Sequence, residues 1–186
     1  MTSPALSEVT MAIRTLMALV FLTAAVGKMR HWTVFQGVIA NYRLLPTSLV
    51  APFAYFLPPF EAVLGAALLI GLLRPWPELA ATTLLTMFAV AMGINLQRGR
   101  RHIDCGCFQS ALRQSLSWNL VIRNGVMVVL LGAASMLEDR SGDLAMKLEG
   151  IMVGGVLFVI LQSLNILWGI VPAWRRDQRF ASEATR

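Results

Sequence analysis

Five long apolar runs, separated by short polar segments, make up most of the sequence. They cover approximately residues 9–26, 49–73, 79–96, 118–137 and 150–171. Each run can cross the hydrocarbon core of a bilayer, about 30 Å thick, and without water there its backbone has to be helical. The pattern predicts an all-α, polytopic membrane helix bundle with about five transmembrane helices. We expect one transmembrane domain over residues 1–174 and a basic tail at 175–186.

The composition excludes an ordinary water-soluble domain, because 56% of the residues are hydrophobic and only 14% are charged. Two runs carry no charged residue, and the other three carry one each, at Arg14, Glu61 and Arg123. No basic region precedes the first run, so we interpret it as a retained anchor and not as a cleaved signal peptide. The net charge of +6 does not predict nucleic-acid binding, because the basic residues lie in the short segments between runs.

Smaller features modify this picture. Phe35, Val38 and Ile39 follow a helical spacing between the first two runs and predict a short helix, either along the membrane interface or packed on the bundle. We expect Pro46 to end it. The second run contains prolines that predict a kink or partial unwinding, namely Pro52, Pro58 and Pro59. Small residues mark possible close approaches of helices, namely Gly65, Ala66, Gly93, Gly125, Gly132, Gly154 and Gly155.

Ionisable groups inside membrane spans usually face a cavity or a partner. At the helical rise of about 1.5 Å per residue, Glu61 and Arg123 fall at overlapping depths, so we expect them to pair. Asparagines in the same half of the membrane would complete an intramembrane polar pocket, namely Asn95, Asn119 and Asn124. Such a pocket would suit a membrane quinone head group or a proton path, and the alternative is a salt bridge that only fixes helix packing. Arg14 lies nearer the opposite surface, where we expect it to snorkel.

The two cysteines of the chain, Cys105 and Cys107, lie two residues apart in the polar segment 97–117. Gly106 supplies the backbone freedom to bring their sulfurs together, and the small ring predicts a strained, exchangeable disulfide. Arg101 and His102 lie close by in the sequence and would favour the reactive thiolate. These residue types predict a thiol-disulfide carrier, a candidate thiol-disulfide oxidoreductase, with the cysteines as its catalytic pair.

A metal site is the rival chemistry for this segment. Its ligands would be His102, Asp104, Cys105 and Cys107. Neighbours this close seldom enclose a tetrahedral ion unaided, and the other histidine, His31, is remote in the sequence. We therefore expect no metal.

Lysine and arginine are unevenly divided between the two ends of the predicted bundle. The end with the cysteines carries Lys28, Arg30, Arg43, Arg98, Arg100, Arg101, Arg113, Arg175, Arg176, Arg179 and Arg186. The other end carries only Arg74, Arg140 and Lys147. The positive-inside rule thus predicts that the cysteines face the cytoplasm.

Several motifs resemble the methylamine utilisation family MauE, within the wider DoxX-like membrane family, whose core has four helices. The most specific is Asp104-Cys105-Gly106-Cys107-Phe108. Weaker matches are Gly27-Lys28, Tyr42 with Leu45-Pro46, Pro59 with Glu61 and Gly65, Asn95, Arg98-Gly99 and Arg123-Asn124. They lie between residues of about 20 and 130, and Gln109 replaces the glycine that usually follows the phenylalanine.

The resemblance implies a multi-pass protein of the bacterial cytoplasmic (inner) membrane. Its role would be to help mature the small, disulfide-rich subunit of methylamine dehydrogenase, which carries tryptophan tryptophylquinone in the periplasm. The partners so implied are that subunit and MauD, a membrane-anchored thioredoxin-like protein. A periplasmic cysteine loop would suit this role and conflicts with the charge pattern. Either electrons cross the bundle, or several arginines are held by partners. A quinone-linked oxidoreductase subunit and a non-catalytic scaffold or transport component remain as alternatives.

Overall fold

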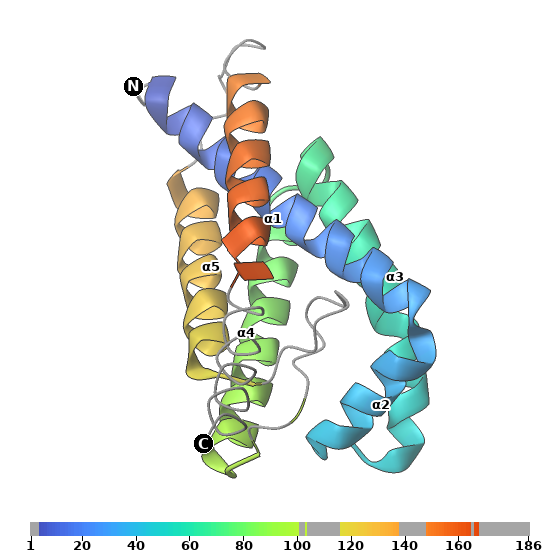
Figure 1. Cartoon of the computed structure of the whole chain (residues 1–186). Helices are drawn as coiled ribbons and strands as arrows, with labels where there is room; N and C mark the ends of the chain where they lie inside the picture. The colour runs from blue at the N-terminus through green and yellow to red at the C-terminus, as the bar shows by residue number, and fades with distance from the viewer. Residues whose placement is uncertain (1–3, 101–102, 104–115, 138–147, 165, 168–186) are drawn as a thin grey trace, which may run out of the picture.

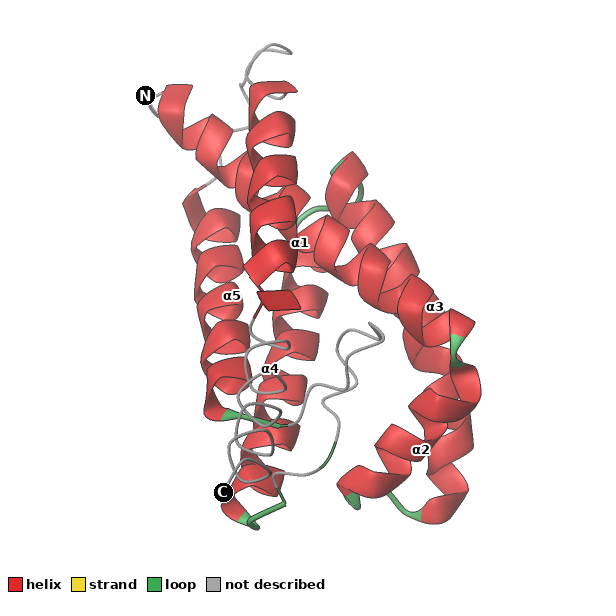
Figure 2. Ribbon diagram, in the orientation of Figure 1, coloured by secondary structure: helices red, strands yellow, loops and turns green. Residues whose placement is uncertain are grey.

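The computed structural model describes residues 4–100, 103, 116–137, 148–164 and 166–167. Over these residues the chain is helical and has no strand, as Figure 2 shows. The helices are α1 (Pro4–Arg30), α2 (Trp32–Tyr42), α3 (Thr47–Ile70), α4 (Trp76–Gln97) and α5 (Trp118–Leu137), followed by an apolar helix at Leu148–Leu164. This arrangement confirms the predicted all-α bundle.

Four of the described helices, α1, α3, α4 and α5, are long and apolar enough to cross a membrane. Their outer faces carry large apolar side chains that would be costly to leave in water, for example Phe56, Val63, Val129 and Met136. The chain is therefore a multi-pass membrane protein. The Leu148–Leu164 helix is apolar but shorter than these four, and the end of the predicted fifth span lies outside the described residues.

Two helix pairs form the core of the bundle. α1 packs along α3 and α4 packs along α5, as the diagonal blue helix and the green and yellow helices of Figure 1 show. Gly65 of α3 lies directly against Ala18 and Leu22 of α1, so a methyl group there would meet their atoms at about 3 Å. Gly154 lies as close to Ala12 of α1. The prediction of close approach is thus confirmed at these two glycines, whereas Gly93, Gly125, Gly132 and Gly155 face open space.

The short helix α2 lies mainly against α3. Its residues Phe35, Val38 and Ile39 are buried, and Trp32 packs on Tyr55 of α3 with ring centroids 4.3 Å apart. Packing on the bundle, one of the two alternatives, is thus confirmed for this helix, and its position along the membrane interface stays a prediction. It ends at Tyr42, before Pro46, because Arg43 adopts a left-handed conformation and caps the helix, and Pro46 instead precedes α3.

The prolines of α3 do not unwind it. Pro52, Pro58 and Pro59 all lie inside one continuous helix that ends where Gly71 takes the left-handed conformation. The expectation of partial unwinding was wrong, because the helix continues through all three prolines, whereas the kink stays a prediction. A tight turn then leads into α4.

The same end of the bundle holds α2, the end of α4 and the start of α5. Figure 1 shows these three segments in its lower half, and the turn from α3 to α4 lies at the opposite end. The segment that carries the cysteines connects α4 to α5, so both of its described ends belong to the α2 end.

Candidate functional site

The buried face of α1 carries two cations. Arg14, Met17, Phe21, Ala24 and Lys28 follow each other at intervals of three or four residues, and all five are buried. Arg14 and Lys28 are thus on one helical face, separated by about 21 Å along the axis at the usual rise. Each lies near one end of the bundle and meets a carboxylate from another helix.

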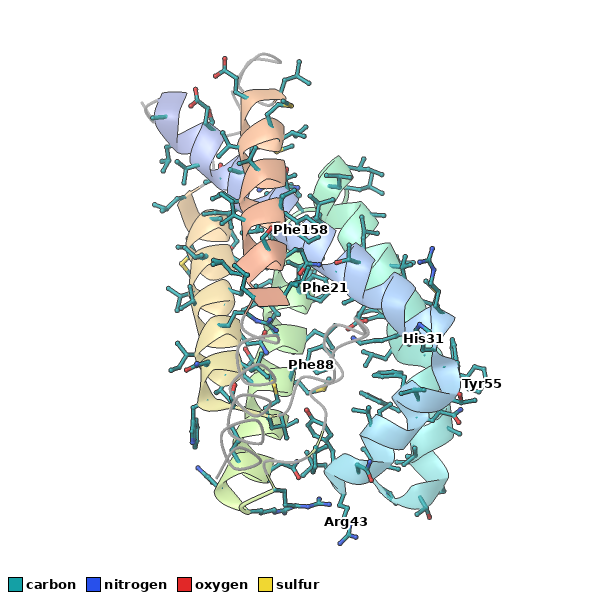
Figure 3. The ribbon with its side chains drawn as sticks, in the orientation of Figure 1. Phe21, His31, Arg43, Tyr55, Phe88 and Phe158 are labelled. Carbon is teal, nitrogen blue, oxygen red and sulfur yellow. The ribbon has the colours of Figure 1, made fainter. Side chains whose placement is uncertain are left out.

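Lys28 forms a buried ion pair with Glu61 of α3, and the side chains of both residues are at most 3% exposed. The Lys28 ammonium also lies over two aromatic rings, 5.3 Å from the centroid of Phe35 and 5.0 Å from that of Phe88. Figure 3 shows Phe88 on α4 within the bundle, and Arg43 at the end of the bundle where α2 lies. The structure pairs Glu61 with Lys28, where the sequence pattern predicted Arg123, because Lys28 belongs to α1 and not to a loop.

At the other end, Arg14 also turns inward. Its guanidinium lies 3.2 Å from the carboxylate of Glu78 on α4, and it donates a hydrogen bond of 3.0 Å to the Leu68 carbonyl near the end of α3. Arg74 donates to the same Glu78 oxygen at 2.9 Å. The expectation that Arg14 snorkels to the surface was wrong, because this carboxylate and the negative end of the α3 dipole neutralise it inside the bundle.

A small cavity of about 30 Å³ adjoins the Lys28–Glu61 pair. Arg123 and Asn124 of α5 line it together with Lys28 and Glu61, so three of the five predicted pocket residues share one cavity. Asn124 is 3% exposed, and its Nδ2 has no hydrogen-bond partner in the described structure. The same is true of the Glu61 Oε2 atom. A donor and an acceptor are thus both available at this cavity.

The other two predicted pocket residues lie elsewhere. Asn95 is fully buried near the end of α4, where it donates to the Ala91 carbonyl at 3.0 Å and accepts from Arg100 at 3.2 Å. It therefore holds the end of the helix together. Asn119 is exposed in the first turn of α5 and does not line the small cavity.

A larger, apolar cavity of about 190 Å³ lies between α2, α3 and α4. Its walls are mainly aliphatic and aromatic side chains, including Phe35, Phe53, Leu57, Met87, Phe88 and Met92. Lys28 and Phe88 line both this cavity and the small one, so the two are neighbours. The Lys28 ammonium adds a positive charge to this mainly apolar cavity.

The predicted redox residues fall outside the described part of the chain. These are Arg101, His102, Asp104, Cys105, Gly106 and Cys107, which also include the rival metal ligands. The flanking residues are described: Ile103 and Leu116 are joined by a backbone hydrogen bond of 3.0 Å and pack with Met92, Leu96 and Leu120. The base of the cysteine segment thus adjoins Met92, which lines the larger cavity.

Two buried charges, Lys28 and Glu78, did not emerge as site residues from the sequence pattern. Both lie just beyond the ends of apolar runs, so hydropathy assigned them to loops. The signal that could have found Lys28 is its spacing of four residues from Ala24 and seven from Phe21, which continues the buried face of α1.

Comparisons with known proteins place the chain beside one group. The family model of methylamine utilisation protein MauE matches residues 6–137. Relatives named methylamine utilization protein MauE are 38% identical in Paracoccus denitrificans and 40% in Paracoccus versutus, over 87% and 86% of this chain and 88% and 87% of theirs. The one from Methylorubrum extorquens is 35% identical over 91% of this chain and 92% of its own. No solved structure matches the chain significantly.

Proposed function

The chain belongs to the MauE family of methylamine utilisation proteins, and from this premise we propose that it supports maturation of the methylamine dehydrogenase small subunit by thiol-disulfide exchange. It acts in the bacterial inner membrane, with the small subunit and the thioredoxin-like MauD as its partners. The observation that carries the proposal is the Cys105-Gly106-Cys107 sequence between two membrane helices of a protein with no other cysteine.

The exchange needs only the two cysteines and a partner with a disulfide or a dithiol. When the pair is oxidised, a partner thiolate attacks one of its sulfurs, the Cys105–Cys107 bond breaks, and a mixed disulfide forms. A second partner thiolate then displaces the cysteine sulfur, so the partner gains a disulfide and the pair becomes a dithiol. Two electrons pass from the partner to the pair, and the reverse sequence of attacks returns them.

The surroundings of the segment support this chemistry. Arg98 and Arg100 precede the cysteines and contribute positive charge, which stabilises a thiolate. Ile103 and Leu116 fix both sides of the segment to the ends of α4 and α5. This anchoring of Ile103 and Leu116 supports an exchange that takes place close to the membrane, where a membrane-anchored partner would meet the pair.

The test replaces each cysteine separately with serine in cells grown on methylamine. We expect Cys105→Ser and Cys107→Ser each to abolish active methylamine dehydrogenase, while Ser115→Ala in the same segment leaves it unchanged. Immunoblotting of membranes checks that all variants accumulate equally.

One serine variant should also trap the partner. The cysteine left without its neighbour cannot resolve the mixed disulfide, so a higher-mass species that disappears on reduction should accumulate. Normal dehydrogenase in both single variants would refute the exchange and leave a non-catalytic scaffold.

A further inference from the structure

We infer that the cavity between α2, α3 and α4 is a binding site for a membrane quinone, whose ring lies among the apolar side chains and whose carbonyl faces Lys28. This inference goes beyond the proposed thiol exchange and does not depend on it. It rests on the volume of the cavity, its lining and the polar groups at its inner end.

The volume fits one six-membered ring. The cavity measures about 190 Å³, and a protein cavity of about 150 Å³ lined by aliphatic and aromatic groups takes up benzene. Phe35, Phe53 and Phe88 on three different helices supply aromatic surface around it. A flat ring of this size gains contact on both faces.

The inner end of the cavity is polar. Lys28 supplies ammonium protons beyond the one that Glu61 accepts, and a lysine ammonium is a donor for carbonyl oxygens. Behind it, the small cavity of about 30 Å³ has room for about two water molecules. Asn124 Nδ2 and Glu61 Oε2, both buried and without a hydrogen-bond partner in the described structure, line that space.

These groups select the class of ligand. A quinone carbonyl accepts hydrogen bonds, as the Lys28 ammonium requires. A fatty acyl chain would fill the apolar part of the cavity but offers no acceptor to the ammonium. The cation at the end of an apolar cavity therefore favours a quinone over a lipid tail.

The experiment uses the full-length protein in lipid nanodiscs and a photoreactive short-chain azidoquinone. We expect saturable labelling of α2, α3 or α4, located by mass spectrometry of the peptides. Decylubiquinone should compete with the label, and decylbenzene, which has a ring and the same chain but no carbonyl, should not.

Two variants test the position. Ala91 lines the cavity, so Ala91→Phe should fill it and reduce the competable labelling at least tenfold. Ala133→Phe on the exposed face of α5 is the matched control and should label like the unchanged protein.

Three results would overturn the inference. In the first, the label of the unchanged protein is distributed evenly over all lipid-facing peptides. This result can be interpreted without any variant. Another is equal labelling of the Ala91→Phe and Ala133→Phe proteins when both elute and melt as folded bundles. The third is competition by decylbenzene as strong as that by decylubiquinone.

Discussion

Lys28 and Glu61 neutralise each other inside the bundle, and their energetic role can be measured. Lys28→Met leaves the Glu61 carboxylate buried without its cation, which should lower the free energy of unfolding by about 3–5 kcal/mol. The double variant Lys28→Met with Glu61→Leu removes both charges and should recover most of that loss. Unfolding in mild detergent, followed by circular dichroism, measures both changes.

The control for this pair is Arg30→Met, two residues further along α1 on its exposed side. It should change the free energy of unfolding by less than about 0.5 kcal/mol. If the double variant were as unstable as Lys28→Met alone, the ion pair would not be the source of the effect.

Glu78 has two cationic neighbours that differ in burial. The side chain of Arg14 is 5% exposed and that of Arg74 is 22% exposed. Arg14→Met should therefore lower the melting temperature clearly more than Arg74→Met, since it also removes the hydrogen bond to the Leu68 carbonyl. Equal melting temperatures of the two variants, measured side by side, would contradict the assigned roles.

At this scale the sequence predicted that charges inside the spans would find partners, but not which partners. Glu61 was recognised because it interrupts an apolar run, whereas Lys28 and Glu78 escaped notice because each lies where a run ends. Which helices are neighbours decides the pairing, and hydropathy along one helix carries no information about its neighbours. Arg123 and Asn124 were placed in the correct half of α5 because helical rise fixes depth.

The α1–α3 contact depends on the absence of a side chain at Gly65. Gly65→Ala should destabilise the bundle by about 1–3 kcal/mol, because the new methyl group meets the Ala18 carbonyl and Leu22. Gly93→Ala in the interior of α4 is the control: nothing lies near it, so it should stabilise its helix by up to about 1 kcal/mol. Thermal unfolding of the two purified variants gives the comparison, and a shift of the same sign in both would exclude the packing explanation.

The helices themselves were largely predictable. Long apolar runs fix where spans lie, and α5 begins and ends at the predicted residues, Trp118 and Leu137. Helix ends set by backbone conformation were missed: α3 stops at Ile70 because Gly71 turns left-handed, although the apolar run continues to Leu73. The three prolines of α3 were overrated as helix breakers, because the helix continues past all of them.

The whole bundle has two ends that can be told apart by their charge. Lys28 is buried in an ion pair and no longer counts as a loop charge, yet Arg30, Arg43, Arg98 and Arg100 still mark the α2 end. In a variant with Cys105 and Cys107 replaced by serine, we expect Arg43→Cys to be labelled by a membrane-impermeant thiol reagent only after spheroplasts are lysed.

Leu72→Cys, in the turn at the opposite end, is the matched probe and should be labelled in intact spheroplasts. The reverse pattern would place the α2 end in the periplasm and would show that the arginines do not set the orientation. Labelling of both positions from one side would contradict the fold.

The cations of α1 also have a consequence for the order in which the protein is made. Translation releases α1 first, while the carboxylates that neutralise Lys28 and Arg14 arrive later, on α3 and α4. Until then the nascent helix carries two charges whose carboxylate partners have not yet been made, and lipid disfavours such charges. A ribosome-bound chain that stops before Glu78 should therefore leave Arg14 accessible to solvent reagents, and complete burial of α1 should wait for the fourth helix.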